Sequence, residues 1–337
     1  MKVLITGIAG HIPSRLAQWI LDNIPDCEVY GVDDHTCGYF ENIPEKATYE
    51  VLSLGDTWTV RPLEEMFQEV GPFDYVFHMA AYAAEGLSPF IREYNYKNNL
   101  MATAEVVNCC LRHPPKRLVF TSSMAVYGKG TPPFTEDDPC NPIDPYGIAK
   151  RACELDIMQA GEQHGLQWTI IRPHNFYGPY QSIWQKYRNV FGIWMSRILE
   201  DKPLLIFGDG TQTRAFSYIQ DALPCFWTAA TSAQTQGEII NLGGIHACSI
   251  REAAESLMRI TGYDRVEYAD QRHEAHQAYT TYEKSVDLLG FEHKTHLERG
   301  LTEMWTWAQR AWELYPERRE HFLPEIEVSK GLYKQWQ

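Results

Sequence analysis

Positive charge is scarce in this sequence. The 337 residues contain 30 Lys and Arg against 44 Asp and Glu, which gives a formal net charge of −14. A surface of this sign repels nucleic-acid backbones and anionic lipid headgroups, so neither is expected as a partner. A phosphate-binding site in such a chain has to be local, built from backbone amides and a few arginines.

Long apolar runs and metal-binding cysteine motifs are also missing. No run of about 18 apolar residues is present, and the N-terminal apolar stretch is too short for a signal peptide. Apart from the neighbours Cys109 and Cys110, the eight cysteines are scattered, with no Cys-x-x-Cys or Cys/His ligand spacing. We therefore expect a cytoplasmic protein with reduced thiols, no membrane span and no metal site.

Segments typical of strands alternate with segments typical of helices through the first half of the chain. The expected strands are Val3–Thr6, Glu28–Val32, Thr48–Leu52, Tyr75–Met79, Arg117–Thr121 and Thr169–Arg172. The expected helices are Ser14–Asn23, Pro62–Glu69, Tyr96–Arg112 and Pro145–His164. This alternation predicts an α/β fold with a doubly wound parallel sheet covered by helices on both faces.

The pattern becomes irregular after Pro173 and returns to strand-like runs at Ala215–Ile219 and Glu238–Leu242. A chain of this length is long for one core. We expect a dinucleotide-binding domain from residues 1–173 and 215–243, and a smaller mixed α/β domain from 174–214 and 244–325. Residues 326–337 form a tail with no evident role. The cleft between the domains is the expected ligand site.

The first strand is followed by the turn Gly7-x-x-Gly10-x-x-Pro13. In a Rossmann-type fingerprint the first glycine makes the tight turn and the second lets the backbone approach a pyrophosphate at the helix N-terminus. The third glycine, which serves packing, is replaced by Pro13. Proline is favoured in the first turn of a helix, so we expect the loop still to bind a dinucleotide.

Asp33 ends the second strand, about where such a fingerprint places the carboxylate that binds the adenosine ribose. A carboxylate there accepts hydrogen bonds from the ribose hydroxyls and repels a 2′-phosphate, which favours NAD over NADP. Asp33 alternatively serves only as a turn cap, and Asp34 has the chemistry for either role.

Three further residues indicate acid–base chemistry. Ser123 follows a strand, and Tyr146 and Lys150 lie four residues apart on one face of a helix. A nearby ammonium favours the phenolate and lowers the pKa of a tyrosine, which makes Tyr146 usable as a base near neutral pH. Ser123 can hydrogen-bond the same substrate hydroxyl. The alternative for the tyrosine–lysine pair is an ordinary amphipathic helix face.

Taken together, these motifs resemble the extended short-chain dehydrogenases/reductases that act on nucleotide sugars, of which UDP-glucose 4-epimerase is an example. The resemblance covers nearly the whole chain. It rests on the glycine turn, GVDD, HMAA, NNLMAT, SSMAVYG, PYGIAK, RPHNFYGP, GDGTQTRAFSYI, NLGG and the late LLGF and LERGL.

The resemblance implies NAD as cofactor, together with a set of residues that bind it. Those under the pyrophosphate and at the ribose are Gly7, Gly10, His11, Ile12 and Asp33. Those at the adenine are Ser53 and Leu54, although the family usually has Asp at the first of these positions. Those on the nicotinamide side are Met79, Ala80, Ala81, Asn99, Tyr146, Lys150 and Pro173.

The same resemblance implies a site for a UDP-sugar. Its residues are Glu85 and Ser123 near the sugar, the phosphate-contacting Asn175, Asn189 and Val190 over the nucleotide, Phe207 beside the base, the diphosphate arginines Arg214 and Arg272, and Tyr279. A residue as large as Tyr279 at its position suggests a plain hexose over an N-acetyl sugar. Arg214 could instead be an exposed hairpin charge.

Epimerisation at C4 is the reaction that these residues favour, with Ser123, Tyr146 and Lys150 as the catalytic set. Met124 and Ala125 stand where related dehydratases carry an Asp–Glu pair, and Ala125 stands where GDP-mannose 3,5-epimerases carry a cysteine. A 4-ketoreductase keeps the same catalytic set and stays open. So do a uronate 4-epimerase, with Lys186 or Arg188 near the carboxylate, and a non-catalytic scaffold.

The resemblance also implies a homodimer. In the family, helices matching Tyr96–Arg112 and Pro145–His164 pair across a two-fold axis. Their apolar residues, such as Val107 and Ile157, suit both a dimer interface and an ordinary core, so the sequence leaves the two open.

Overall fold

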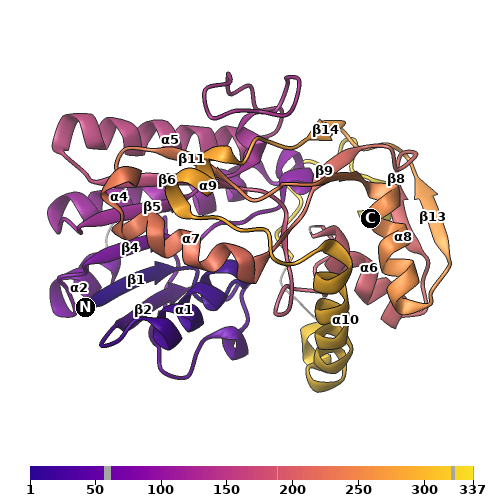
Figure 1. The fold of residues 1–337 in the computed structure, drawn as a ribbon, viewed down its shortest axis with the longest axis horizontal. Helices are drawn as coiled ribbons and strands as arrows, with labels where there is room; N and C mark the ends of the chain where they lie inside the picture. The colour runs from indigo at the N-terminus through magenta and orange to yellow at the C-terminus, as the bar shows by residue number, and fades with distance from the viewer. Residues whose placement is uncertain (57–61, 188, 320–322, 337) are drawn as a thin grey trace.

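A seven-stranded parallel sheet organises the fold. The structure is a computed structural model that describes residues 1–56, 62–187, 189–319 and 323–336 (Figure 1). The sheet runs in the order β11 (Ile239–Leu242), β6 (Trp168–Pro173), β5 (Arg117–Thr121), β4 (Tyr75–His78), β1 (Lys2–Thr6), β2 (Glu28–Asp33) and β3 (Thr48–Val51). The strand order reverses between β1 and β4, which makes the sheet doubly wound and confirms the predicted α/β fold.

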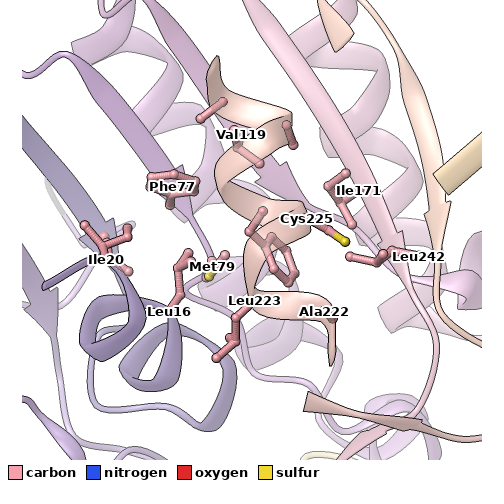
Figure 2. Packing of buried hydrophobic residues seen from close by; sticks show 14 of the residues in the cluster. Leu16, Ile20, Phe77, Met79, Val119, Ile171, Ala222, Leu223, Cys225 and Leu242 are labelled. Carbon is pink, nitrogen blue, oxygen red and sulfur yellow. The ribbon is translucent and has the colours of Figure 1, made fainter. Parts of the chain in front are cut away.

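Helices cover both faces of this sheet (Figure 1). One face packs against α1 (His11–Asn23) and α7 (Ile219–Thr231), and the other against α2 (Pro62–Glu69), α4 (Ala102–Arg112) and α5 (Pro145–His164). Figure 2 shows Leu16 of α1, Phe77 of β4 and Leu223 of α7 in the first of these cores. Because both faces are buried, the strands read as continuous apolar runs.

The helix expected over Tyr96–Arg112 begins earlier. It starts with α3 (Arg92–Tyr96), continues through a π-helical segment Lys97–Met101 and ends with α4. In its first part, apolar residues do not recur at helical spacing, because buried asparagines occupy inward positions there and their side-chain amides hydrogen-bond to backbone carbonyls. The Asn95 amide donates to the Pro145 carbonyl at 3.0 Å, and the Asn99 amide donates to the Asn95 carbonyl at 2.8 Å.

The strand-like run Ala215–Ile219 does not join the main sheet, contrary to our expectation. β9 (Thr213–Ala215) pairs with β12 (Ala247–Ser249) and β14 (Gln277–Ala278), while β10 (Ser217–Tyr218) pairs with β7 (Phe176–Tyr177). The run is shared between two small sheets because Phe216 and Tyr218 are buried in a separate hydrophobic core, which belongs to the smaller layer of helices and strands described next.

The smaller layer contains α6 (Val190–Leu199), α8 (Ile250–Thr261) and α10 (Leu297–Leu314) beside the parallel pair β8 (Leu204–Phe207) and β13 (Val266–Ala269). Its centre is the fully buried Trp194, whose indole N–H donates to the Leu205 carbonyl at 2.8 Å.

Helix α9 (Glu283–Leu289) lies elsewhere than expected. We placed it in the smaller domain, but Leu289 and the following Phe291 are buried in the core of the main sheet. Burial of these apolar side chains against α7 decides the position, and nothing in the local sequence distinguishes the two cores. Within the described ranges, no helix is long and apolar enough to span a membrane.

Candidate active site

A cavity of about 480 Å³ lies where β1, β2, β4, β5 and β6 end and the smaller layer faces them. Ligands of open α/β sheets bind at this edge, where the strand order reverses. The cavity brings together all but three of the residues predicted for the site, namely Gly7, Gly10, His11, Ile12, Asp33, Leu54, Met79, Ala80, Ala81, Glu85, Ser123, Tyr146, Lys150, Pro173, Asn175, Asn189, Val190, Phe207, Arg214 and Arg272.

Three predicted residues are not in the cavity wall. The Ser53 hydroxyl donates to the Asp56 carboxylate at 3.2 Å, and Leu52, which we did not predict, lines the cavity instead. Asn99 is 1% exposed, with its amide bonded to backbone carbonyls below the wall.

Tyr279 is the third. Ala278 occupies the wall, because successive residues of an extended segment point to opposite sides. The Tyr279 carbonyl accepts a hydrogen bond from the Phe134 amide at 3.1 Å. The structure therefore gives no support to Tyr279 as a gate for the sugar.

The glycine turn packs closely against the residues that follow β4 because it lacks side chains. Gly7 has φ +74°, and a Cβ there would lie 2.8 Å from the Ala80 Cα. Gly10 is the N-cap of α1, in extended conformation, and Pro13 lies buried in the first turn. The exposed backbone amides at this helix start suit a pyrophosphate, so Pro13 is compatible with a dinucleotide site.

Replacing Gly7 by Ala should lower the affinity of the protein for NAD, measured as the NAD content of the purified protein. The variant combines a strained left-handed backbone with a clash against the Ala80 backbone. Gly165→Ala is the matched control, because Gly165 has φ +75° with no atom within 4 Å of the added methyl group. We expect that control to lose only about 1–2 kcal/mol of stability and to keep its cofactor. Equal NAD content in both variants would contradict the role of this turn.

Asp33 connects the glycine turn to the next loop. One carboxylate oxygen accepts from the Ala9 amide at 3.0 Å and the other accepts from the His35 amide at 2.8 Å. The turn-cap role is thus present. A carboxylate has about four acceptor positions, so it retains capacity for ribose hydroxyls. Burial raises the pKa of the Asp33 carboxyl above its usual value.

His11 lines the cavity beside the glycine turn. Its ring is buried, and burial lowers the pKa of the imidazole to about 3. Within the described residues, its Nε2 atom has no hydrogen-bond partner. In the surroundings that the protein alone provides, the His11 imidazole is therefore neutral at physiological pH.

The catalytic set lies at the same sheet edge. Lys150 donates from Nζ to the Thr121 carbonyl at 2.8 Å, and this nitrogen lies 6.0 Å from the centre of the Tyr146 ring. Burial lowers the pKa of the Lys150 ammonium to about 8, which leaves it mostly charged at pH 7. Ser123 begins a short turn, with its hydroxyl accepting from the Ala125 amide at 3.1 Å.

A buried ion pair that we did not predict holds these elements together. Glu154 of α5 accepts from Nε and Nη2 of Arg172 on β6, both at 2.8 Å, and from the Ser122 hydroxyl at 2.6 Å. Arg172 also donates to the Tyr127 hydroxyl at 2.8 Å. The signal was available as an arginine inside the apolar run TIIRP, although its partner could not be identified from spacing.

The two predicted diphosphate arginines share one carboxylate. Arg214 and Arg272 donate to Glu274 at 3.2 and 3.0 Å, and the Arg272 guanidinium lies 4.5 Å from the Phe207 ring centre. The Arg214 side chain is 14% exposed, which excludes the exposed hairpin charge considered above. We did not predict Glu274. A diphosphate in this part of the cavity has to compete with it for the arginines.

Three further predicted nucleotide-binding residues, Asn175, Asn189 and Val190, line the same cavity. The side-chain amide of Asn175 donates to the Ala215 carbonyl at 3.0 Å. Asn189 adopts φ +63° as the N-cap of α6, and Val190 is the first residue of that helix. Asparagine is one of the few residues with a side chain that adopts this left-handed conformation readily.

Glu85 adds a carboxyl group to the cavity wall. Its side chain is accessible to solvent, but the protein packed around this position, together with the like charge of Asp144, raises the pKa of the carboxyl above its usual value, against the opposing effect of Arg214 and Arg272. Its protonated form repels a diphosphate less than its ionised form.

Affinity for a nucleoside diphosphate should therefore fall as the pH rises and Glu85 ionises, because the carboxylate repels the diphosphate and its pKa is raised above the usual value. The Glu85→Gln variant should show a flatter profile, since it cannot ionise. Calorimetric titrations from pH 6 to 8 measure this, with the exposed Glu50→Gln as a control that keeps the wild-type profile. A pH dependence that survives in Glu85→Gln would show that another group controls binding.

Comparisons with known proteins agree with this geometry. The model of the NAD dependent epimerase/dehydratase family matches residues 3–243. A UDP-glucuronate 4-epimerase of Thermodesulfobacterium geofontis is 29% identical over 323 residues, 92% of this chain and 97% of that protein. Other relatives are named as a dTDP-D-glucose 4,6-dehydratase and a UDP-N-acetyl-α-D-glucosaminuronate decarboxylase.

Solved structures show the same likeness. UDP-glucose 4-epimerase of Thermotoga maritima, crystallised with UDP-glucose, superposes with a TM-score of 0.85 at 28% identity, covering 93% of this chain and 100% of that one. UDP-glucuronic acid 4-epimerase of Bacillus cereus, in complex with UDP-glucuronic acid and NAD, gives 0.83 at 27% identity, covering 92% and 99%. The chain therefore belongs to the NAD-dependent epimerase/dehydratase family, and its cofactor is NAD.

Proposed function

We propose that the protein catalyses NAD-dependent epimerisation of a nucleotide sugar at C4, with a UDP-hexose as substrate. The observation that carries this proposal is one cavity that contains Ser123, Tyr146 and Lys150 at one sheet edge and the arginine pair Arg214 and Arg272 in its wall. Asp33 and the glycine turn lie in the same cavity, where they suit the cofactor.

In this proposal Tyr146 accepts the proton of the sugar 4-hydroxyl and later returns it. The Lys150 ammonium stabilises the phenolate, and the Ser123 hydroxyl orients the substrate oxygen. Bound NAD⁺ supplies a reversible hydride acceptor for C4. Arg214 and Arg272 would hold the diphosphate, so that the 4-keto sugar can rotate about its link to the diphosphate and offer the opposite face of C4 to the returning hydride.

The residues disfavour the other reactions of the family to different degrees. Met124 and Ala125 line the cavity where a dehydratase requires titratable groups, so dehydration receives no support. A 4-ketoreductase stays the second candidate, since it needs no residue beyond this catalytic set. A uronate 4-epimerase is supported by the relative named as a UDP-glucuronate 4-epimerase and by the cation Lys186 in the cavity wall. It is opposed by Glu85 in the same wall, because a carboxylate there repels an anionic sugar. Arg188, the other cation considered for a uronate, lies outside the described residues.

The test begins with protein purified without added cofactor. Denaturation should release near-stoichiometric NAD⁺, because an epimerase regenerates its cofactor and need not exchange it. Incubation with UDP-, GDP- and CDP-sugars should then convert one UDP-hexose into its C4 epimer. Released NADP⁺, or consumption of added reduced cofactor, would favour a ketoreductase. Bound NAD without turnover of any sugar nucleotide would favour a non-catalytic scaffold.

We also propose a homodimer in the cytoplasm, formed through α4 and α5. Val107 and Ile157 belong to the core of the monomer, but Met101, Ile148 and Leu155 are 45%, 42% and 46% exposed. Exposed apolar residues on neighbouring helices are typical of an association surface.

Leu155→Glu should convert the dimer into a monomer, because it places a charge in the proposed interface. Sedimentation velocity measures the mass. Val286→Glu is the matched control, since Val286 is 42% exposed on α9, away from these helices, and should leave the dimer intact. A wild-type protein that sediments as a monomer would contradict the proposal directly.

A further inference from the structure

The segment of residues 326–336, the tail, packs beside the cavity. Its Trp336 is only 5% exposed. The sequence assigned no role to this tail, so its role has to be argued from its contacts.

The tail is first fixed to the segment that carries Glu85. The Glu327 carboxylate accepts hydrogen bonds from the amides of Glu93 and Tyr94, both at 2.8 Å. The Glu327 amide donates to the Phe90 carbonyl at 2.9 Å. These bonds join the tail to the turn Glu85–Phe90 and to the first residues of α3.

The indole of Trp336 then packs against the nucleotide side of the site. Its ring centre lies 5.2 Å from that of Tyr187 and 6.2 Å from that of Phe207, in edge-to-face geometry. The Arg272 guanidinium lies 5.9 Å from the same indole. Tyr333 adds a hydrogen bond, accepting from the His273 amide at 2.9 Å.

The opposite edge of the indole meets the loop that carries Glu85. A Cβ added to Gly86 would lie 3.1 Å from Cη2 of Trp336 and 3.5 Å from Nη1 of Arg272. A side chain at position 86 would force the indole to shift by a few tenths of an ångström. Trp336 therefore touches both walls of the nucleotide-sugar side, Gly86 on one and Phe207 with Arg272 on the other.

We propose that residues 326–336 form a clasp that fixes the nucleotide-sugar half of the cavity, with Trp336 as a positioning residue for Phe207 and Arg272. The proposal rests on the proposed function, because it assigns these two residues to the nucleotide. With Trp336 present, the Arg272 guanidinium is already confined between aromatic rings. Its conformational entropy is then lost on folding, not on binding, which strengthens affinity.

The clasp acts on one half of the cavity only. Among the residues that the structure describes, the ring contacts and hydrogen bonds of Tyr333 and Trp336 outside the tail reach Phe90, Tyr187, Phe207, Arg272 and His273, and none of them reaches the glycine turn or Asp33. Removal of the clasp should weaken binding of the nucleotide sugar and leave NAD in place. A purely structural role would reduce both.

The experiment measures the dissociation constant for UDP-glucose by calorimetry and the NAD content of the same preparations. Trp336→Ala, and a chain that ends at residue 325, should each bind UDP-glucose about tenfold more weakly, the scale of one lost aromatic contact. Both should retain wild-type NAD content. Trp336→Phe should recover part of the affinity, and Lys330→Ala, an exposed position of the same segment, should change nothing.

Unchanged or tighter binding by Trp336→Ala would overturn the clasp while the proposed function stands. So would a parallel loss of NAD and UDP-glucose together with a lower unfolding temperature. If the wild-type protein holds NAD but binds no UDP-sugar, the proposed function itself fails, and the clasp fails with it.

Discussion

Tyr146→Phe should lower turnover of the sugar nucleotide by about a thousandfold, within the range that general acid–base catalysis contributes. The phenol oxygen is the group that the proposed reaction requires, and the phenylalanine ring preserves packing at a position that is 8% exposed. NAD content and affinity for UDP-glucose should therefore stay close to wild type. The measurement is the initial rate of epimer formation, beside calorimetric binding and released NAD⁺.

A control separates this effect from the general loss of a hydroxyl group. Tyr268→Phe removes a phenol from a residue that is 56% exposed on β13, and it should keep full activity. If Tyr146→Phe retained a tenth or more of the wild-type rate, another group would have to be the base, and the assignment of the catalytic set would be wrong.

Arg172→Met should produce the largest loss of stability, about 3–5 kcal/mol in the free energy of unfolding. Glu154 is fully buried, and removal of the arginine leaves its charge with Ser122 and the part-exposed Arg151 as neighbours. The close carboxylate also holds the pKa of the Arg172 guanidinium above its ordinary value. Urea unfolding followed by far-ultraviolet circular dichroism measures the change.

Two variants test the cause of that loss. Arg259→Met breaks a pair whose partners are 59% and 60% exposed, and it should cost no more than about 1 kcal/mol. Adding Glu154→Leu to Arg172→Met should recover much of the lost stability, because no unpaired buried charge then remains. Equal losses in the two arginine variants would show that the buried pair contributes no more than a surface pair.

Local sequence signals were sufficient for the main sheet and for the cofactor half of the site. The strand β5 is a continuous apolar run, and helix α5 has clear end signals, with Asp144 accepting from the Gly147 amide at its start and Gly165 in left-handed conformation at its end. Tyr146 and Lys150 share a helix face by their spacing alone. Gly7 follows β1 directly, so the turn could be located to the residue.

The substrate half depended on contacts that sequence spacing does not contain. Glu274 lies between two arginines that come from separate segments, and Ala278 replaces Tyr279 in the wall because of the direction in which an extended segment points. Helix α9 packs on the main sheet, although its apolar residues would suit either core.

The sequence by itself therefore determined the doubly wound fold, the glycine turn and the tyrosine–lysine pair, because each depends on neighbours within one or two turns of the chain. Only the tertiary structure decided that Glu154 meets Arg172, that Glu274 shares two arginines, and that the tail brings Trp336 to Arg272. Apart from the pair of Arg272 and Glu274, which lie two residues apart, those contacts join residues from different elements or segments. Burial and charge select such contacts only after the elements have packed.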